Sequence, residues 1–398
     1  MRVDPARIYR TGSRAVRHSG VLAAMAGGWL AAECRPHVLA AQAISSLPVP
    51  VGPVGDLAHG VAAQHSDVVL DRVLREAFGD RFAEEAVHPR TPSRRAGSRG
   101  PVTVLRYRRR YCAGAADIAY FDGGRAHTLD IWRRPDTRRD APVLLHIPGG
   151  AWSVNDKRGQ GYPLLAAMAE RGWVGVSVNY RRSPHHAWPA HVVDVKRAVA
   201  WVRRNIADFG GDPGFIAVTG GSAGGHLSAL TALTVNEPRF QPGFESADTT
   251  VHAAVPMYGV FDLTDSRLMH PQMMPFLERS VLKTPLAHSR DIYELASPVC
   301  HVSSDAPPFF VLHGAKDNVV PPGQSRVFSA ALRSAGAPTV LYAELPNAHH
   351  MFDALASVRA HLVAQNVAAF LGIVYARHLA ARTGGPLQPG GAREGRGC

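Results

Sequence analysis

Residues 215–226 read Phe-Ile-Ala-Val-Thr-Gly-Gly-Ser-Ala-Gly-Gly-His, and this stretch is the best guide to the architecture of the chain. Its first five residues favour a strand, the residues from His226 onward favour a helix, and Ser222 stands between them. A strand that turns sharply into a helix strains the central residue and leaves no room for a Cβ two positions away, which explains Gly220 and Gly224. The pattern predicts a serine hydroxyl that projects clear of the sheet and an Ala223 N–H at a helix N-terminus.

A glycine-rich turn without chemistry is the alternative, because the chain contains 38 glycines. The order of later residues separates the two interpretations. Pro308–Leu312 reads as a buried strand that runs into a polar turn containing Asp317, and 338–345 reads as a second strand followed by His349 and His350. We expect one crossover helix and one strand between Asp317 and His350, which places both loops at the same edge of the sheet.

A loop that can bind an oxyanion is expected before the serine. The apolar run 142–147 ends in Pro148-Gly149-Gly150-Ala151-Trp152. A glycine-rich loop lets backbone N–H groups face a developing alkoxide without interference from side chains. The oxyanion-hole residues are therefore Gly149, Gly150, Ala151 and Ala223, in which Gly149 mainly supplies the bend and the other three supply the N–H donors.

These motifs resemble those of the α/β-hydrolase esterases and lipases of the hormone-sensitive-lipase branch. The resemblance covers roughly residues 115–372 and includes Asn179-Tyr180-Arg181-Arg182-Ser183-Pro184 and Gly210-Gly211-Asp212-Pro213. It differs from the family pattern at Pro148, where relatives carry a histidine, at Ala151, where they carry a third glycine, and at Gly221, where many carry an acid. With Gly221 at this position, the chain is more similar to the carboxylesterase and acyl-carbohydrate esterase members of the family than to the lipase.

The resemblance implies a serine carboxylic-ester hydrolase with a Ser222, Asp317 and His350 triad, an acyl-enzyme intermediate, and short- to medium-chain acyl esters as small-molecule substrates. His349 is the alternative to His350, and Asp353 the alternative to Asp317. An arylformamidase or other amidase with the same triad, and a non-catalytic binding protein of the same fold, also stay open.

The expected fold is an α/β-hydrolase fold, a mostly parallel sheet of about eight strands with helices on both faces. Strands are expected at 117–121, 127–132, 142–147, 172–180, 215–219, 251–259, 308–312 and 338–345, and helices at 161–171, 190–208, 224–235, 323–335 and 351–372. Segment 263–304 interrupts this rhythm, and we expect its methionines and Phe276 either to line an acyl pocket or simply to pack between helices.

Charge and cysteine content argue against several other classes of function. The net charge of +12 is concentrated near the start of the chain, where residues 1–110 hold 17 arginines and 9 acidic residues. The sequence shows no nucleic-acid-binding motif, so we expect no nucleic-acid partner, and we interpret Arg106–Arg110 as an outer strand. Four scattered cysteines and two His-His pairs suggest neither a metal nor another cofactor.

The chain divides into a helical N-terminal extension and linker (1–100), a catalytic domain (101–382) and a tail (383–398). The run Val21–Ala32 has 12 apolar residues, fewer than the roughly 20 that span a bilayer. Three interpretations stay open for residues 18–50: a cleaved export signal, a helix on a membrane surface, and a lid or cap over the catalytic site. The compartment, cytoplasmic or envelope-associated, and the oligomeric state are not set by the sequence.

Overall fold

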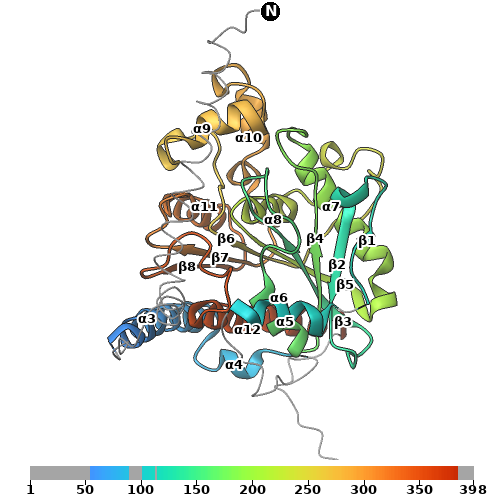
Figure 1. Cartoon of the computed structure of the whole chain (residues 1–398), viewed down its shortest axis with the longest axis vertical. Helices are drawn as coiled ribbons and strands as arrows, with labels where there is room; N and C mark the ends of the chain where they lie inside the picture. Colours follow the sequence, from blue (N-terminus) through green and yellow to red (C-terminus); the bar gives the residue numbers. More distant parts are fainter. Residues whose placement is uncertain (1–53, 89–100, 113, 384–398) are drawn as a thin grey trace, which may run out of the picture.

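A computed structural model describes residues 54–88, 101–112 and 114–383 (Figure 1). The apolar run Val21–Ala32, residues 89–100 of the expected linker 89–101 and residues 384–398 of the expected tail 383–398 lie outside the described residues, whereas Pro101 and Thr383 are helical.

Eight strands form one sheet in the order β1-β2-β4-β3-β5-β6-β7-β8. β1 and β2 form an antiparallel hairpin, β2 pairs antiparallel with β4, and every pairing from β4 to β8 is parallel. The strands are β1 (Ile118–Ala119), β2 (Thr128–Trp132), β3 (Ala141–Ile147), β4 (Val174–Val178), β5 (Gly211–Gly221), β6 (Ala253–Met257), β7 (Phe309–Gly314) and β8 (Val340–Leu345). The expected mostly parallel sheet of about eight strands is confirmed.

The strands differ in burial according to their place in the sheet. Every residue of β3, β4, β6 and β7 is buried, as is typical of parallel strands covered on both faces. β8 lies at the edge, and its residues alternate between intermediate and buried. Because all strands from β3 to β8 run in the same direction, the loops after β5, β7 and β8 leave from the same edge of the sheet.

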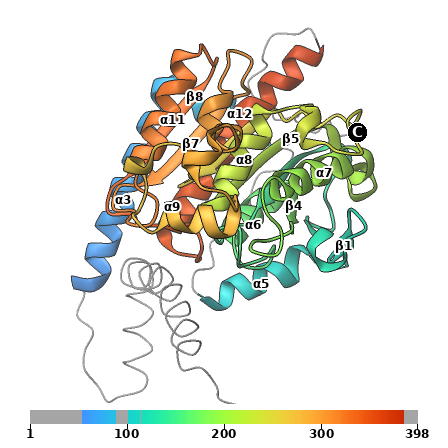
Figure 2. The same cartoon turned by 90° about the horizontal axis from the view of Figure 1, so that it is seen from above.

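Helices cover both faces, as Figures 1 and 2 show. The α-helices are α3 (Val54–Phe78), α4 (Phe82–Glu85), α5 (Pro101–Tyr111), α6 (Tyr162–Glu170), α7 (Ala190–Asn205), α8 (Ala223–Leu233), α9 (Met273–Phe276), α10 (Arg290–Leu295), α11 (Gly323–Ser334) and α12 (Val358–Thr383). Apolar side chains of α7, α8 and α11 form one core with the sheet. Those of α3, α4, α6 and α12 form a second core on the other face.

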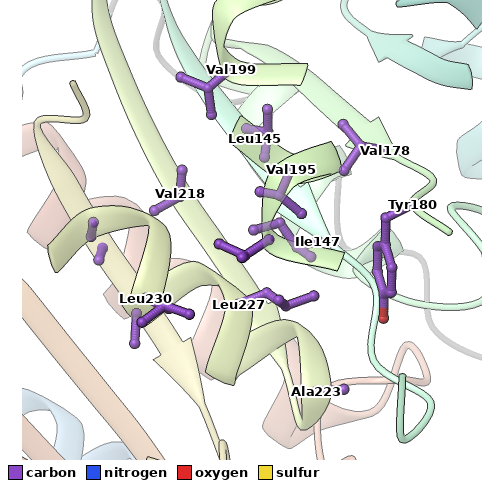
Figure 3. Packing of buried hydrophobic residues seen from close by; sticks show 14 of the residues in the cluster. Leu145, Ile147, Val178, Tyr180, Val195, Val199, Val218, Ala223, Leu227 and Leu230 are labelled. Atoms are coloured by element: carbon purple, nitrogen blue, oxygen red, sulfur yellow. The ribbon is translucent and has the colours of Figure 1, made fainter. Parts of the chain in front are cut away.

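The first core holds the serine-bearing helix against the centre of the sheet. Leu227 and Leu230 of α8 pack with Ile147 and Val218 of the strands beneath them, all with no exposed surface (Figure 3). Burying such side chains contributes about 1.5–3 kcal/mol each. The first turn of α8 is therefore held against the ends of β3 and β5.

Two elements differ from the sequence-based predictions. The arginine-rich run Arg106–Arg110 is helical, in α5, and not an outer strand. Tyr107 and Tyr111, four residues apart, are both buried, and this is the spacing of one helix face. α12 begins at Val358 instead of 351, because Met351 has a left-handed backbone with φ 60° and the chain turns before the helix starts.

α12 alone, among the helices of the described segments, has the length and apolar composition of a membrane-spanning segment. However, 67% of its most apolar stretch is buried inside the fold, where it packs against the sheet. Burial of this kind is typical of a core helix.

α3 packs on the catalytic fold, on the side opposite α9 and α10 in Figure 1. Leu70 and Leu74 are fully buried in the second core, which includes residues of α12 and β8. Arg359 of α12 donates to Ser66 Oγ of α3 (3.3 Å) and to the carbonyl of Asn347 (3.5 Å), three residues before His350. α3 thus supports the helix that braces the histidine loop.

Shortening a buried side chain of α3 tests whether this helix is part of the cooperative fold. We expect Leu70→Ala to lower the free energy of unfolding by about 2–5 kcal/mol, through lost burial and the cavity it leaves. The measurement is urea denaturation followed by circular dichroism. Val68, 65% exposed on the same helix, is the matched control, and Val68→Ala should change stability by less than about 0.5 kcal/mol. Equal, small effects of both changes would show that α3 is not part of the cooperative fold.

Candidate active site

Ser222 occupies a strained turn between β5 and α8. Its φ is 57° and its ψ is −122°, a region that costs a non-glycine residue about 1–3 kcal/mol. A Cβ on Gly220 would lie 2.4 Å from the Ile147 carbonyl oxygen, and one on Gly224 would lie 2.0 Å from the same atom. Neither distance is possible, so both glycines are required for the turn to pack on β3.

Backbone contacts hold this turn at the end of the sheet. The Ser222 N–H donates to the Met257 carbonyl (3.0 Å) at the end of β6, and the Ser222 carbonyl accepts from the His226 N–H (2.9 Å). Ala223 is the first residue of α8, and the first N–H groups of a helix have no intrahelical acceptor. The partial positive charge of the helix N-terminus adds to that N–H beside the serine.

The loop after β3 has a backbone that favours exposed N–H groups. Gly150, Ala151 and Trp152 have φ values of 107°, 51° and 55°, all positive. A Cβ on Gly150 would lie 2.3 Å from the Val154 carbonyl oxygen, so the glycine is needed there. Within the described part of the chain, the N–H groups of Gly150 and Ala151 donate to no protein acceptor.

Gly149 differs from its neighbours in this loop. Its N–H donates to Gln160 Oε1 at 2.8 Å and is therefore not free to bind an oxyanion. A Cβ on Gly149 would also lie 2.4 Å from the Gly221 carbonyl oxygen and 3.2 Å from Ser222 Cβ. Gly149 therefore lets the loop approach Ser222 closely but supplies no donor, and its assignment to the oxyanion hole holds only in that limited sense.

The Asn179–Pro184 motif braces the same loop from β4. Tyr180 Oη donates to the Pro148 carbonyl (2.9 Å), and Asn179 Oδ1 accepts from the Lys157 N–H (2.8 Å). The Ser183 N–H donates to the Trp152 carbonyl (2.9 Å). The structure thus gives this motif a role that its sequence did not disclose.

Asp317, in the turn after β7, is buried and accepts several hydrogen bonds. Oδ1 accepts from the N–H groups of Val319 and Val320, both at 2.9 Å. Oδ2 accepts from His350 Nδ1 at 2.7 Å and lies 3.3 Å from His313 Nε2. Burial by itself raises the pKa of this carboxyl, but the charge and hydrogen bonds of His350 and His313 outweigh burial and hold the pKa well below its usual range.

His350 follows β8 and presents its two ring nitrogens differently. Nδ1 must carry the proton, because it faces the Asp317 carboxylate, which leaves Nε2 with a lone pair. Nε2 is buried and has no hydrogen-bond partner among the described residues. His349, the alternative, makes no hydrogen bond to Asp317 in the described part of the chain, and its Nδ1 is without a partner there.

Tyr258, directly after β6, links the serine turn to the histidine. Its ring centroid lies 4.7 Å from that of His350, and a Cβ on Gly221 would lie 2.2 Å from its hydroxyl oxygen. Tyr258 therefore contacts both His350 and the turn that carries Ser222. Sequence reasoning missed this residue, and its only signal was a tyrosine at the end of a predicted strand.

Asp353 does not contact His350 through a hydrogen bond. Its Oδ1 accepts from the Tyr258 hydroxyl, and burial raises the pKa of its carboxyl. It stands in the turn before α12 and does not begin that helix. The structure therefore brings Asp317 to His350 and leaves Asp353 to Tyr258.

Side chains that could bind a metal ion do not cluster within the described ranges. In those ranges, no group of three or more histidine, cysteine, aspartate or glutamate side chains could hold a metal ion. Cys112 is a buried free thiol and Cys300 an exposed one. A serine in a strained strand–turn–helix, a histidine bound to a buried aspartate, and free N–H groups on the loop after β3 are the features of a serine hydrolase of the α/β-hydrolase fold.

Comparison with known proteins agrees with this class. Residues 129–332 match the BD-FAE family. The chain is 52% identical to Esterase LipQ of Mycobacterium tuberculosis H37Rv, over 94% of this chain and 90% of that protein. It is 50% identical to the Probable carboxylic ester hydrolase LipM of the same organism, over 87% of this chain and 81% of that protein.

A solved structure shows the same fold. The butyrate-bound esterase Est2 of the Planctomycetes species Thermogutta terrifontis superposes with a TM-score of 0.53 and 25% identity, covering 70% of this chain and 98% of that one. The chain belongs to the BD-FAE family of hormone-sensitive-lipase-like α/β-hydrolase esterases. It is a carboxylic-ester hydrolase.

The low pKa of Asp317 predicts a measurable pH dependence of stability. An aspartate whose pKa is lowered by folding stabilises the native state above its unfolded pKa, and this contribution is lost as the pH falls through the folded value. We therefore expect the difference in unfolding free energy between wild type and Asp317→Asn to shrink from pH 4 to pH 2, measured by denaturant titration. Asp305→Asn, at an exposed carboxyl, should follow the wild type at each pH. A difference that stays constant would contradict the ionised, buried state of Asp317.

Proposed function

We propose that Ser222 is the nucleophile, His350 the general base and Asp317 the residue that orients His350. The observation that carries this proposal is the 2.7 Å hydrogen bond between His350 Nδ1 and Asp317 Oδ2, with Nε2 buried and unpartnered and with Tyr258 in contact with both His350 and the serine turn. The bond sets the tautomer in which Nε2 accepts the proton of the Ser222 hydroxyl. The ionised Asp317 then stabilises the imidazolium that forms.

The reaction follows from these positions. Ser222 Oγ attacks the ester carbonyl carbon as its proton moves to His350 Nε2, and the N–H groups of Gly150, Ala151 and Ala223 bind the resulting oxyanion. The intermediate collapses when His350 returns the proton to the departing alcohol. Water then hydrolyses the acyl-enzyme with His350 acting again as base, which regenerates the Ser222 hydroxyl and releases the acid.

For the acyl side of the substrate we propose the surface of segment 263–304. Met269 is buried, and Met273, Met274 and Phe276 pack half-buried against the first core. Methionine side chains adapt to ligands of different shape, which suits short- to medium-chain acyl groups. The butyrate bound to Est2 is a short-chain acid of this kind.

Paired p-nitrophenyl esters and p-nitroanilides of one acyl group distinguish the proposed esterase activity from the amidase alternative.

For partners other than the ester we propose a lipid surface and no nucleic acid. Arg108 and Arg110 of α5 pair with the buried carboxylates of Asp130 and Glu170, which supports a structural use of this basic cluster. Residues 18–50 contain the apolar run Val21–Ala32, which lies between Arg17 and Arg35, and a run of this kind favours binding in the plane of a membrane surface. Residues 54–88, in contrast, pack with the catalytic fold and are proposed to belong to it.

Replacing the proposed triad tests the mechanism. We expect Ser222→Ala and His350→Ala to lower kcat for p-nitrophenyl butyrate by about four or more powers of ten, because the nucleophile or its base is lost. His349→Ala is the matched control at the neighbouring position and should keep most of the turnover. Wild-type rates in Ser222→Ala, or a larger loss in His349→Ala than in His350→Ala, would refute the assignment.

Deleting residues 1–53, which ends just before α3, tests the membrane proposal. We expect the truncated enzyme to hydrolyse p-nitrophenyl acetate within about threefold of the full chain, since the triad lies elsewhere, but to lose co-sedimentation with phosphatidylglycerol vesicles. A series of p-nitrophenyl esters from acetate to laurate is measured in parallel. Unchanged vesicle binding contradicts the proposal, and an altered chain-length preference without any vesicle effect assigns the segment to a lid instead.

A further inference from the structure

His226 stands in the first turn of α8, four residues after Ser222, with only 1% of its surface exposed. Its ring makes two hydrogen bonds to distant parts of the chain. Nδ1 accepts from Trp152 Nε1 at 3.1 Å, and Nε2 donates to the Ala296 carbonyl at 2.7 Å. The ring therefore joins three parts of the chain: the loop after β3 that contains Gly150, Ala151 and Trp152 (the oxyanion loop), the serine-bearing helix α8, and the end of α10.

The partners of His226 determine its protonation state. The Trp152 indole nitrogen can only donate and the Ala296 carbonyl can only accept, so the ring must be neutral, with its proton on Nε2. Burial supports this state, because it lowers the pKa of His226 to about 4. A charged ring would have a second N–H facing that of Trp152, so the bridge exists only in the neutral form.

The oxyanion loop needs such a tether. Gly150, Ala151 and Trp152 all have positive φ, and this conformation is strained for the two non-glycine residues. Gln160 and Tyr180 hold the start of the loop, while the Trp152 indole connects its end to the helix that carries Ser222. An oxyanion donor must lie within about 2.7–3.1 Å of the developing charge, so its distance from the serine has to be set accurately.

We propose that His226 is a positioning residue that acts through Trp152 to hold the N–H groups of Gly150 and Ala151 in register with Ser222. Through its hydrogen bond to Ala296, the same ring also connects the oxyanion loop to segment 263–304, for which we propose contact with the acyl side of the substrate. The inference rests on the proposed function, since it assumes that Ser222 and this loop perform the reaction. His226 does not touch the reacting atoms.

Three variants separate the two ends of the bridge. His226→Gln keeps a donor near the Nε2 position and loses the acceptor for Trp152. His226→Asn keeps an acceptor near the Nδ1 position and loses the bond to Ala296. Trp152→Phe removes the indole N–H. The control for a Trp-to-Phe change is Trp132→Phe, because Trp132 is also fully buried and its Nε1 has no hydrogen-bond partner among the described residues.

We expect His226→Gln and Trp152→Phe to lower kcat for p-nitrophenyl acetate by about ten- to a hundredfold, less than the loss of a whole oxyanion donor, with KM changed less than about threefold. His226→Asn should recover most of this kcat and instead alter the preference among longer acyl esters. The double variant Trp152→Phe/His226→Gln should be no slower than the slower single variant, because both changes remove one bond. Trp132→Phe should match the wild type in kcat.

Thermal unfolding of each variant shows that it is folded at the assay temperature. Wild-type kcat in folded His226→Gln and Trp152→Phe would overturn the inference, as would a loss in His226→Asn equal to that in His226→Gln. Ser222→Ala, assayed alongside, separates this failure from that of the proposed function. If Ser222→Ala is inactive while the His226 variants are unaffected, only the positioning role is refuted, and if Ser222→Ala is active, the proposed function itself fails.

Discussion

The packing of two glycines on one carbonyl oxygen is the constraint on which the site depends. Gly220 and Gly224 both lie against the Ile147 carbonyl, at distances that exclude any side chain. This contact brings the end of β3 and the start of α8 together, so that the loop after β3 and the serine before α8 share one edge of the sheet. The strain at Ser222 is sustained by the apolar packing of α8, in which Leu227 and Leu230 are fully buried.

Electrostatics then set the states of the two titratable partners. Asp317 receives two backbone N–H groups and a histidine N–H, so it stays ionised even though it is buried. His350 is thereby held in the tautomer that leaves Nε2 as an acceptor. Tyr258 occupies the space that a side chain at Gly221 would need, and its ring packs against His350. Gly221, where many family members carry an acid, thus leaves room for the Tyr258 ring that packs against His350.

Much of this arrangement could be predicted from local patterns. The strands and crossover helices from β3 to β8 follow from apolar runs and turn residues, and the Ser222, Asp317 and His350 order follows from the ends of those strands. The prediction of an outer strand at Arg106–Arg110 was wrong, because the arginines and Tyr107 alternate as in a strand. The buried residues Tyr107 and Tyr111 decide the structure, and they are four residues apart, which is helical spacing. The roles of Gln160, Tyr180, Tyr258 and His226 could not be predicted, because each depends on a partner far away in the chain.

The central claim is that one serine, prepared by this turn and by the Asp317–His350 pair, attacks the ester. Mass spectrometry of the enzyme after reaction with a fluorophosphonate tests it most directly, since the probe forms a stable covalent bond with an activated serine. The account predicts a single adduct on the peptide that contains Ser222, formed in step with the loss of esterase activity and strongly slowed in His350→Ala. An adduct on another residue, or full activity with Ser222 modified, would contradict it.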